Sequence, residues 1–412
     1  MAKIGDSVKK KVPELRFPGF TDDWEERKLG EFSDVRDGTH ASPKYVSQGH
    51  PMVTSKNLTH SGLDMTDVSF LTDEDFNEIN KRSKVSIGDI LFGMIGTIGN
   101  PVIVDRDDFA IKNVALIKEK TSNPITNKWL LQYLKSPSFN RFIQKENAGG
   151  TQKFIALGLI RDMKLRVPEF DEQQKIGSFF KQLDDTIVLH QRKLDLLKEQ
   201  KKGYLQKMFP KNGAKVPELR FAGFADDWEE RKLSSGLREY TDRVIVEDDK
   251  EYYQISVRNN FGGITLRGSK MGNKIGRKRQ AKINLTKYPQ TLIFTRQTVE
   301  QGGIGWVDKY CDGAIVTENM PTISLDTSVF SKHFLTNLFQ TRIFYKNAIL
   351  DNVEGGSAQI AIHESKFLSS TLLFPNLDEQ EKIGQFFKQL DNTITLHQRK
   401  LDLLKEQKKG FL

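Results

Sequence analysis

Closely spaced basic side chains occupy residues 267–282, which read RGSKMGNKIGRKRQAK with glycines at every fourth position. Such a segment can bend to follow a polyanion, and its cations can neutralise phosphate charges. A solvated basic loop would have the same composition, so both interpretations stay open. The residues predicted to contact phosphates are Lys270, Lys274, Arg277, Lys278, Arg279 and Lys282.

Other polar side chains have the hydrogen-bonding groups that read base edges. Arginine suits the acceptors of guanine, whereas asparagine and glutamine suit adenine. Because any surface loop offers similar residues, these positions are a hypothesis about duplex nucleic acid. The candidates in the second half of the chain are Arg258, Asn259, Asn260, Arg296 and Gln297. Those in the first half are His40, Lys44, Tyr45, Ser55, Lys56, Asn57, Thr151, Gln152 and Lys153.

Sequence signatures of catalysis are missing from the chain. It contains no GxxxxGK[ST] phosphate loop, no HExxH and no GxSxG, and Gly93, Gly96 and Gly99 have the wrong spacing for a dinucleotide fingerprint. The acidic runs at residues 73–75 and 105–108 are typical of solvated faces rather than of a nuclease site. Cys311 is the only cysteine, which excludes an intrachain disulfide and a cysteine-rich zinc site. We therefore predict a chain with no catalytic residues, no metal and no cofactor of its own.

The overall charge agrees with a polyanionic partner. The 412 residues carry a formal net charge of +9, with a pI near 9.2. This favours nucleic acid or an acidic membrane surface as the partner. No apolar run approaches the ~18 residues of a membrane span, and the N-terminus has no signal-peptide pattern. We expect a cytoplasmic protein that does not bind membranes.

Two pairs of repeats frame two dissimilar segments. Residues 11–29 (KVPELRFPGFTDDWEERKL) return at 215–233 with two substitutions, and residues 171–203 return at 378–410. Residues 30–170 and 234–377, which lie between these repeats, hardly resemble each other. A constant frame around two different contents predicts one rigid support that carries two different recognition domains.

The C-terminal repeats have the 3.5-residue period of a coiled-coil seam. If the two helices pair, chain order makes an antiparallel pair the simplest arrangement. A helix of about 39 residues spans roughly 58 Å, which exceeds the ~34 Å turn of B-DNA. The first seam is predicted at Ile176, Phe180, Leu183, Ile187, His190, Leu194 and Leu197, and the second at Ile383, Phe387, Leu390, Ile394, His397, Leu401 and Leu404.

Two further features of the frame carry predictions. His190 and His397 occupy matching seam positions, and we expect them to penalise slipped register rather than to bind a metal. The acidic residues 22–26 predict a helical turn in the lead-in repeat. Trp24 and Leu29, with their counterparts Trp228 and Leu233, are expected to dock each domain onto the frame.

The two variable segments show parallel patterns of short apolar strands broken by glycine. Residues 86–104 and 291–307 have this pattern, and helical patterns follow at 127–146 and 331–347. We predict an α/β (α+β) chain with two mixed domains and a pair of long antiparallel coiled-coil helices related by a pseudo-twofold repeat. The predicted boundaries are 1–29 lead-in, 30–170 first domain, 171–209 first helix, 210–233 linker and second lead-in, 234–377 second domain, and 378–412 second helix.

This layout resembles the specificity subunit of type I restriction–modification enzymes over essentially the whole chain. The resemblance rests on the lead-ins PELRFPGF and PELRFAGF with DDWEERKL, the stretch GDILFGMIGTIGN, and the helices with DEQxKIGxFFKQLD and LHQRKLDLLKEQKKG. The second helix copy runs only to Leu412, whereas the first continues through Met208 and Phe209. The resemblance implies that each variable domain is a target-recognition domain for one half of a split DNA sequence.

The resemblance also implies the partners. The helices would set the unspecified spacer and help to bind modification (methyltransferase) subunits, two of them, and restriction subunits would join the complex. S-adenosylmethionine, ATP and Mg would be bound by those partners, which carry out adenine methylation and ATP-dependent cleavage. The alternative from another class is a two-headed coiled-coil scaffold that binds protein partners without sequence-specific DNA recognition.

Overall fold

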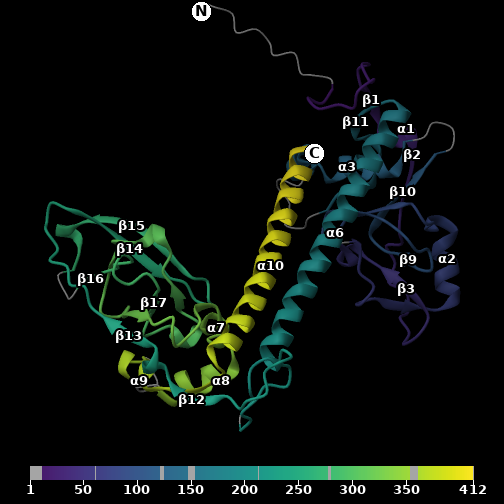
Figure 1. Ribbon diagram of the computed structural model, residues 1–412. Coiled ribbons are helices and arrows are strands. Elements are labelled where there is room, and N and C mark those ends of the chain that lie inside the picture. The colour runs from purple at the N-terminus through teal and green to yellow at the C-terminus, as the bar shows by residue number, and fades with distance from the viewer. Residues whose placement is uncertain are drawn as a thin grey trace, which may run out of the picture. The chain divides into compact units, whose positions relative to one another are not determined.

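The computed structural model describes residues 12–60, 62–120, 125–146, 154–211, 213–276, 280–352 and 361–411. These residues form two compact units: Met1–His190 with Lys400–Leu412, and Gln191–Arg399 (Figure 1). No helix among the described residues is long and apolar enough to cross a membrane.

A four-stranded antiparallel sheet organises the first unit. Its order is β2 (Ser33–Asp37), β10 (Val114–Glu119), β7 (Ile90–Gly93) and β8 (Gly99–Ile103). Alternate residues of β10 enter different hydrophobic clusters: Ala115 and Ile117 pack on one face, and Val114 and Leu116 on the other. Both faces of the sheet are therefore buried, as the nearly continuous apolar run of β10 requires.

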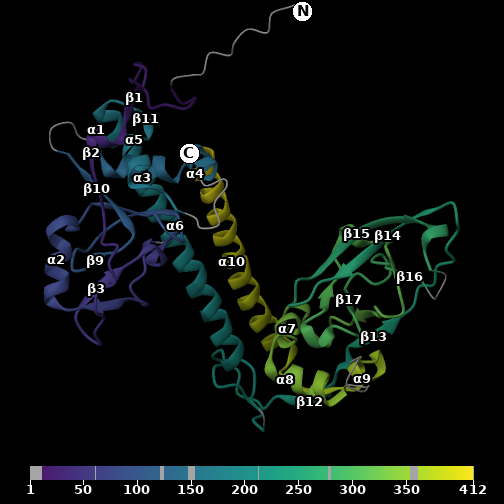
Figure 2. The same ribbon diagram turned by 180° about the vertical axis from the view of Figure 1, so that it is seen from behind.

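A smaller sheet lies next to it. Its order is β6 (Ser69–Leu71), β3 (His50–Val53) and β9 (Ala110–Ile111), with β3 and β9 parallel. Helix α2 (Asp73–Ser83) lies beside this sheet in both views (Figures 1 and 2). The hydroxyl of Thr72 caps this helix by accepting from the Asp75 amide. The 3-10 turn η1 (Ser55–Asn57) and the short strands β4 (Leu58–Thr59) and β5 (Gly62–Leu63) follow β3.

Two sequence-based predictions about the first unit are wrong in detail. The lead-in forms strand β1 (Glu25–Lys28), paired with β11 (Lys164–Val167), because tertiary pairing overrides the helical pattern of its charges. The helix predicted at 127–146 is two helices, α3 (Asn127–Lys135) and α4 (Pro137–Glu146), because proline disfavours helical geometry in the residue before it. The remaining helices here are α1 (Leu29–Phe32) and α5 (Leu157–Asp162).

The second unit repeats the same scheme. Its main sheet has the order β13 (Leu237–Tyr240), β20 (Thr322–Leu325), β17 (Thr291–Phe294), β18 (Ile304–Trp306). The lead-in strand again pairs with a late strand, β12 (Glu229–Lys232) with β21 (Thr371–Phe374). The second sheet has the order β15 (Ile264–Met271), β14 (Glu251–Val257), β19 (Ile315–Val316), β16 (Ala281–Lys282).

The short elements of the second unit complete this scheme. The helix predicted at 331–347 is interrupted, and its pieces are α7 (Lys332–Leu338), α8 (Arg342–Phe344) and a π-helical turn η6 (Tyr345–Ile349). Helix α9 (Glu364–Ser369) precedes β21. The 3-10 turns are η2 (Leu233–Ser235), η3 (Gly272–Lys274), η4 (Val299–Gln301), η5 (Lys309–Cys311) and η7 (Leu350–Asn352).

The two long helices are α6 (Phe170–Lys207) and α10 (Leu377–Phe411), and each contributes a segment to both units. In the second unit Lys201 forms an ion pair of 2.7 Å with Asp391. In the first unit Lys408 pairs with Asp184 at 2.6 Å. Because the partner number falls as the residue number rises, both segments pair in the antiparallel sense. The predicted antiparallel pairing is confirmed.

The seam predicted from the heptads lies on the covered side of both helices. Phe180, Leu194 and Leu197 of α6 and Ile383, Phe387, Leu401 and Leu404 of α10 are buried. Half-buried are Ile176, Leu183, Ile187, His190, Leu390, Ile394 and His397. Phe179 and Phe386, outside the predicted seam, contact Phe411 and Tyr204 at ring-centroid distances of 5.4 and 4.9 Å. No group of three or more metal-ligating side chains occurs among the described residues.

Candidate nucleic-acid interface

In each domain, the segment that follows one strand of the second sheet (β3 or β14) meets a loop or hairpin of the main sheet. In the first domain η1 follows β3 and lies against the β7–β8 hairpin, where a Cβ on Gly93 would lie 3.3 Å from the Cβ of Ser55. In the second domain the β14–β15 turn meets the loop after β17. There the Asn260 amide donates to the Gln301 carbonyl at 2.7 Å. The two meeting points are topologically equivalent, because β3 and β14 each pair in parallel with β9 or β19.

We call residues 38–42, 54–57, 93–99 and 112–113 the first loop edge, and residues 258–263 and 295–303 the second loop edge. Both edges collect predicted site residues that are distant in sequence. Loops on a rigid sheet are the usual place for recognition residues. The loop edges are therefore the candidate interface.

His40 is held by two side-chain contacts at the first loop edge. Its Nδ1 lies 2.7 Å from Asn113 Oδ1 and its Nε2 lies 2.9 Å from Asp37 Oδ2. These contacts, first that with Asn113 and then that with Asp37, raise the pKa of His40. Arg82 also pairs with Asp37, and the side chains of His40 and Arg82 are more than half exposed. Asn113 adopts a positive φ of 57°, which asparagine tolerates. This residue is not among the candidates predicted from the sequence.

Two of the predicted first-domain contacts face the interior instead. Ser55 and Asn57 are 5% and 3% exposed. Ser55 donates to the Asn113 carbonyl, and the Asn57 amide nitrogen donates to the Asp64 and Asp67 carbonyls. Their hydrogen bonds are thus used to shape the turn, and we correct their predicted role from base contact to support.

The remaining first-domain candidates are exposed or lie outside the described residues. Lys44 and Tyr45 are exposed, and Lys56 is exposed and paired with Asp67 at 2.8 Å. Thr151, Gln152 and Lys153 lie outside the described residues. Just after them, Phe154 forms an isolated antiparallel β-bridge with Ile95 of the β7–β8 hairpin. The side chains of both residues are at least one-third exposed. The hairpin therefore adds an apolar pair to the first loop edge.

The predicted contact residues of the second domain lie at opposite ends of the β14–β15 hairpin. Arg258, Asn259 and Asn260 are exposed in its turn, and Asn259 Nδ2 donates to Gln301 Oε1 at 2.7 Å. Lys270 and Lys274 lie at or beyond the opposite end of β15, which has eight residues, so roughly 24 Å of strand intervenes. Lys282 is exposed on β16, whereas Arg277, Lys278 and Arg279 lie outside the described residues. The structure therefore does not bring Lys270 and Lys274 to the second loop edge.

Arg296 of the second loop edge lines an acidic cleft. Its guanidinium pairs with Glu364, and both line a cleft of about 1110 Å³. The described residues of this cleft include six carboxylates and two arginines, and burial followed by repulsion from Glu364 raises the pKa of Glu239. An acidic cleft repels phosphates, so Arg296 is a weaker candidate than its exposed neighbour Gln297.

Each domain is joined to its long helix through the lead-in repeat by the same buried ion pair. Arg16 donates to Glu172 of α6 through two bonds of 2.7 and 2.8 Å, and Arg220 donates to Glu379 of α10 through two bonds of 2.7 Å. Both carboxylates are fully buried. Trp24 also donates to Glu172, at 3.0 Å, and its ring meets Trp129 of α3 edge-on. Trp24 thus contacts both the helix and the domain.

Comparison with known proteins decides the family. A model described as the type I restriction modification DNA specificity domain matches residues 21–199 and, a second time, residues 226–406. The chain belongs to the family of type I specificity subunits. Recognition of a DNA target is the role of this domain, and the specificity subunit is a non-catalytic component of type I restriction–modification systems.

Curated relatives have similar lengths and distant sequences. The putative type I restriction enzyme MjaX specificity subunit of Methanocaldococcus jannaschii is 21% identical, over 95% of this chain and 92% of its own length. The MjaVIII specificity subunit of the same organism is 22% identical, over 98% and 93%. Because both alignments span nearly the whole of each protein, the similarity includes the frame as well as the recognition domains.

Solved structures share the fold. The specificity subunit from M. genitalium superposes with a TM-score of 0.60 at 12% identity, covering 98% of this chain and 97% of its own. A chain from a study of type I complex assembly and conformational transition gives 0.52 at 15% identity, covering 97% and 98%. The predicted fold class, two mixed domains with paired long helices, is confirmed.

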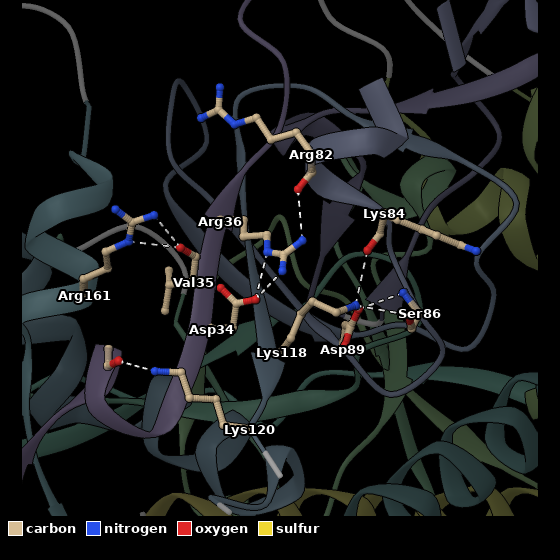
Figure 3. Close-up of polar contacts among 11 residues, drawn as sticks. Asp34, Val35, Arg36, Arg82, Lys84, Ser86, Asp89, Lys118, Lys120 and Arg161 are labelled. Carbon is tan, nitrogen blue, oxygen red and sulfur yellow. Dashed lines mark hydrogen bonds and ion pairs between the residues drawn. The ribbon is translucent and has the colours of Figure 1, made fainter. Parts of the chain in front are cut away.

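Many cations of this specificity subunit serve its own fold. Figure 3 shows four that bond to the protein around the main sheet of the first domain. Arg161 donates to the Val35 carbonyl at 2.7 and 3.0 Å, and Lys120 donates to Gly30 at 2.7 Å. Arg36 donates to Asp34 at 2.8 Å, and Lys118 pairs with Asp89. These hydrogen bonds and ion pairs of the four cations are made within the first domain.

Proposed function

We propose that this specificity subunit reads a bipartite DNA target, with one half-site per variable domain, and directs methyltransferase and endonuclease subunits to it. The observation that carries the proposal is the pair of equivalent loop edges. They occupy the same place in one fold, but they carry different side chains: His40 and Lys56 in the first, Arg258 and Asn259 in the second. Equivalent sheets that carry different side chains at their loop edges suit two different half-sites.

Phosphate contacts supply affinity and base contacts supply sequence in this proposal. Exposed cations such as Lys270 and Lys274, at the far end of the hairpin from the second loop edge, suit phosphates beyond the bases that the turn reads. Binding should therefore weaken as salt rises, whereas the preferred sequence should stay the same. Arg258, Asn259, Asn260 and Gln297 are the predicted base-reading residues that remain at the second loop edge.

The long helices set the spacer between the half-sites. The 38 residues of α6 correspond to about 57 Å of helix, and the matching ion pairs Lys201–Asp391 and Lys408–Asp184 fix one register. A fixed helix register makes the gap between half-sites a property of the frame. The sequence of each half-site remains a property of its domain.

Two modification subunits are the proposed partners of the helices. Leu189 and Leu196 lie one heptad apart on α6 and are 67% and 52% exposed. Their repeat counterparts on α10, Leu396 and Leu403, are 67% and 53% exposed. Two equivalent apolar pairs suit two copies of one partner. S-adenosylmethionine, ATP and Mg would be bound by the partner subunits, and the site of action would be the cytoplasm.

The test is methylation-sensitive sequencing of DNA from cells that express this chain with its modification partner. Matched cells express the partner alone. A new methylated motif in two parts, separated by a fixed unspecified gap, is the expected result. With a partner shown to be active, an absence of new methylation would favour the two-headed protein scaffold. A motif in one continuous part would contradict the bipartite proposal.

A further inference from the structure

The β14–β15 turn contains two consecutive residues in the left-handed region. Asn260 has a φ of 54° and Phe261 a φ of 56°, and the Gly262 amide donates back to the Asn259 carbonyl at 3.1 Å. Two positive φ values inside a turn closed in this way are the mark of a type I′ hairpin turn. Asparagine suits the first of these positions, but glycine is strongly preferred at the second. A bulky aromatic residue at positive φ is an outlier.

The surrounding loop is shaped to hold this phenylalanine. The Phe261 amide donates to the Gly302 carbonyl at 3.0 Å, and Asn260 donates to the neighbouring Gln301 carbonyl. A Cβ on Gly302 would lie 3.1 and 3.2 Å from carbons of the Phe261 ring. Gly302 itself has a φ of 75°, so a side chain there would be both strained and crowded. The ring therefore lies against the backbone of the second loop edge.

Burial does not account for the strained aromatic residue. Phe261 remains 42% exposed, although its ring covers Gly302. Glycine would fit the turn with less strain, and it would not leave apolar surface in water. A local rule broken in this way, at an exposed position, is expected where a residue serves binding. The neighbours Arg258 and Asn259 are exposed polar side chains of the same turn.

We propose that Phe261 is a specificity-determining residue of the second half-site, where its ring contacts the 5-methyl group of a thymine in the major groove. This inference rests on the proposed function. A two-stranded β-ribbon fits the major groove, and Figures 1 and 2 both show β14 and β15 running side by side. Because Gly302 backs the ring, Phe261 offers a surface to a base edge rather than a free wedge for insertion. The thymine methyl is the apolar group that such an edge presents.

The test uses the subunit assembled with its modification partner. The DNA duplexes contain the target sequence that methylation-sensitive sequencing identifies. In one duplex each thymine of the second half-site is replaced by deoxyuridine, which removes only the methyl group. The wild-type complex should bind the duplex that lacks the critical methyl group about fourfold more weakly. The Phe261→Gly complex should bind both duplexes equally, while its thermal unfolding temperature is unchanged or raised. Asn260→Gly is the matched control, because it relieves strain in the same turn and keeps the ring. Whatever the loss of the Asn260 side chain does to the affinity for both duplexes, the ratio between them should stay about fourfold.

The outcomes separate the inference from the proposed function. If the wild-type complex shows no preference for a second half-site, the bipartite proposal fails. The contact with thymine is overturned if the wild-type complex reads that half-site but deoxyuridine leaves its affinity unchanged. It is also overturned if deoxyuridine weakens binding of the Phe261→Gly complex by the same factor. A second half-site without thymine on either strand would overturn it as well. Loss of the preference in Asn260→Gly would point to the turn geometry instead of the ring, which also contradicts the inference.

Discussion

Arg16 and Glu172 form a bidentate ion pair whose carboxylate is completely buried, across 156 residues of chain. Arg220 and Glu379 repeat this relationship at the second domain. The two arginines belong to the lead-in repeats, and the two glutamates lie in the first turns of α6 and α10. Acidic residues suit a helix N-terminus. The repeated frame of the chain therefore has the same arginine–glutamate pair between each lead-in and its helix.

Loss of one joint should strongly destabilise the unit that contains it. In Arg220→Met the buried carboxylate of Glu379 loses both of its arginine hydrogen bonds, and an unpaired buried charge costs about 3–5 kcal/mol of folding free energy. Chemical unfolding of the purified variant measures this loss. Arg231→Met is the control, because it breaks an exposed pair with Glu229 and should cost less than about 1 kcal/mol. Equal losses in both variants would contradict the role of the buried joint.

The exposed leucines of the helices predict the stoichiometry of the complex. Replacing Leu189 and Leu196 with glutamine should leave the stability of the chain nearly unchanged, because both side chains are more than half exposed. The variant should bind one modification subunit instead of two, since the Leu396–Leu403 pair remains. Native mass spectrometry of the assembled complex counts the subunits.

The second leucine pair provides the matching variant. Leu396→Gln with Leu403→Gln should likewise retain one modification subunit, and the quadruple variant should retain none. Two subunits on the quadruple variant would place the partner surface elsewhere. Loss of both subunits from a double variant would indicate cooperative binding rather than two independent sites.

The sequence was most informative where the signal is local and repeated. Heptads reveal the seam through residues such as Leu194 and Leu401, because side chains three and four positions apart share one face of a helix. The contact between Arg16 and Glu172 could not be found in this way, since no periodicity links residues so distant in sequence. Residues 25–28 look helical by composition, and only the pairing with β11 makes them a strand.

The loops were less predictable for a related reason. Ser55 and Asn57 have the chemistry of base readers, but they point inward to close a turn, and composition does not tell which way a polar loop residue faces. Composition does not show that Phe261 is exposed, because aromatic residues are more often buried. Its positive φ, which depends on the neighbouring Gln301 and Gly302, marks it as unusual.

Matched insertions in the long helices should change the spacer alone. Seven residues added between Asp184 and Lys201 in α6, and seven between Asp391 and Lys408 in α10, preserve both ion pairs. The added heptads lengthen the helices by about 10 Å, which corresponds to about three base pairs of B-DNA. Methylation-sensitive sequencing should find both half-sites unchanged and the gap longer. An insertion in one helix only is the control; it breaks the register and should abolish methylation. A changed half-site would contradict the separation of frame and recognition domains.

The protonation of His40 predicts a pH dependence of stability in the first domain. Its hydrogen bonds to Asn113 and Asp37 raise the pKa of the imidazole in the folded chain above its unfolded value near 6.5. A raised folded pKa means that the stabilisation is fully present below about pH 6.5 and is lost as the pH rises through the folded pKa. Thermal unfolding from about pH 5.5 to about pH 8.5 should therefore show His40→Gln less stable than the wild type at the acidic end, with the difference shrinking toward the basic end. His60→Gln, at an exposed position of the same domain, is the control and should follow the wild type throughout. A constant difference between His40→Gln and the wild type would show that the ring acts by packing rather than by its charge.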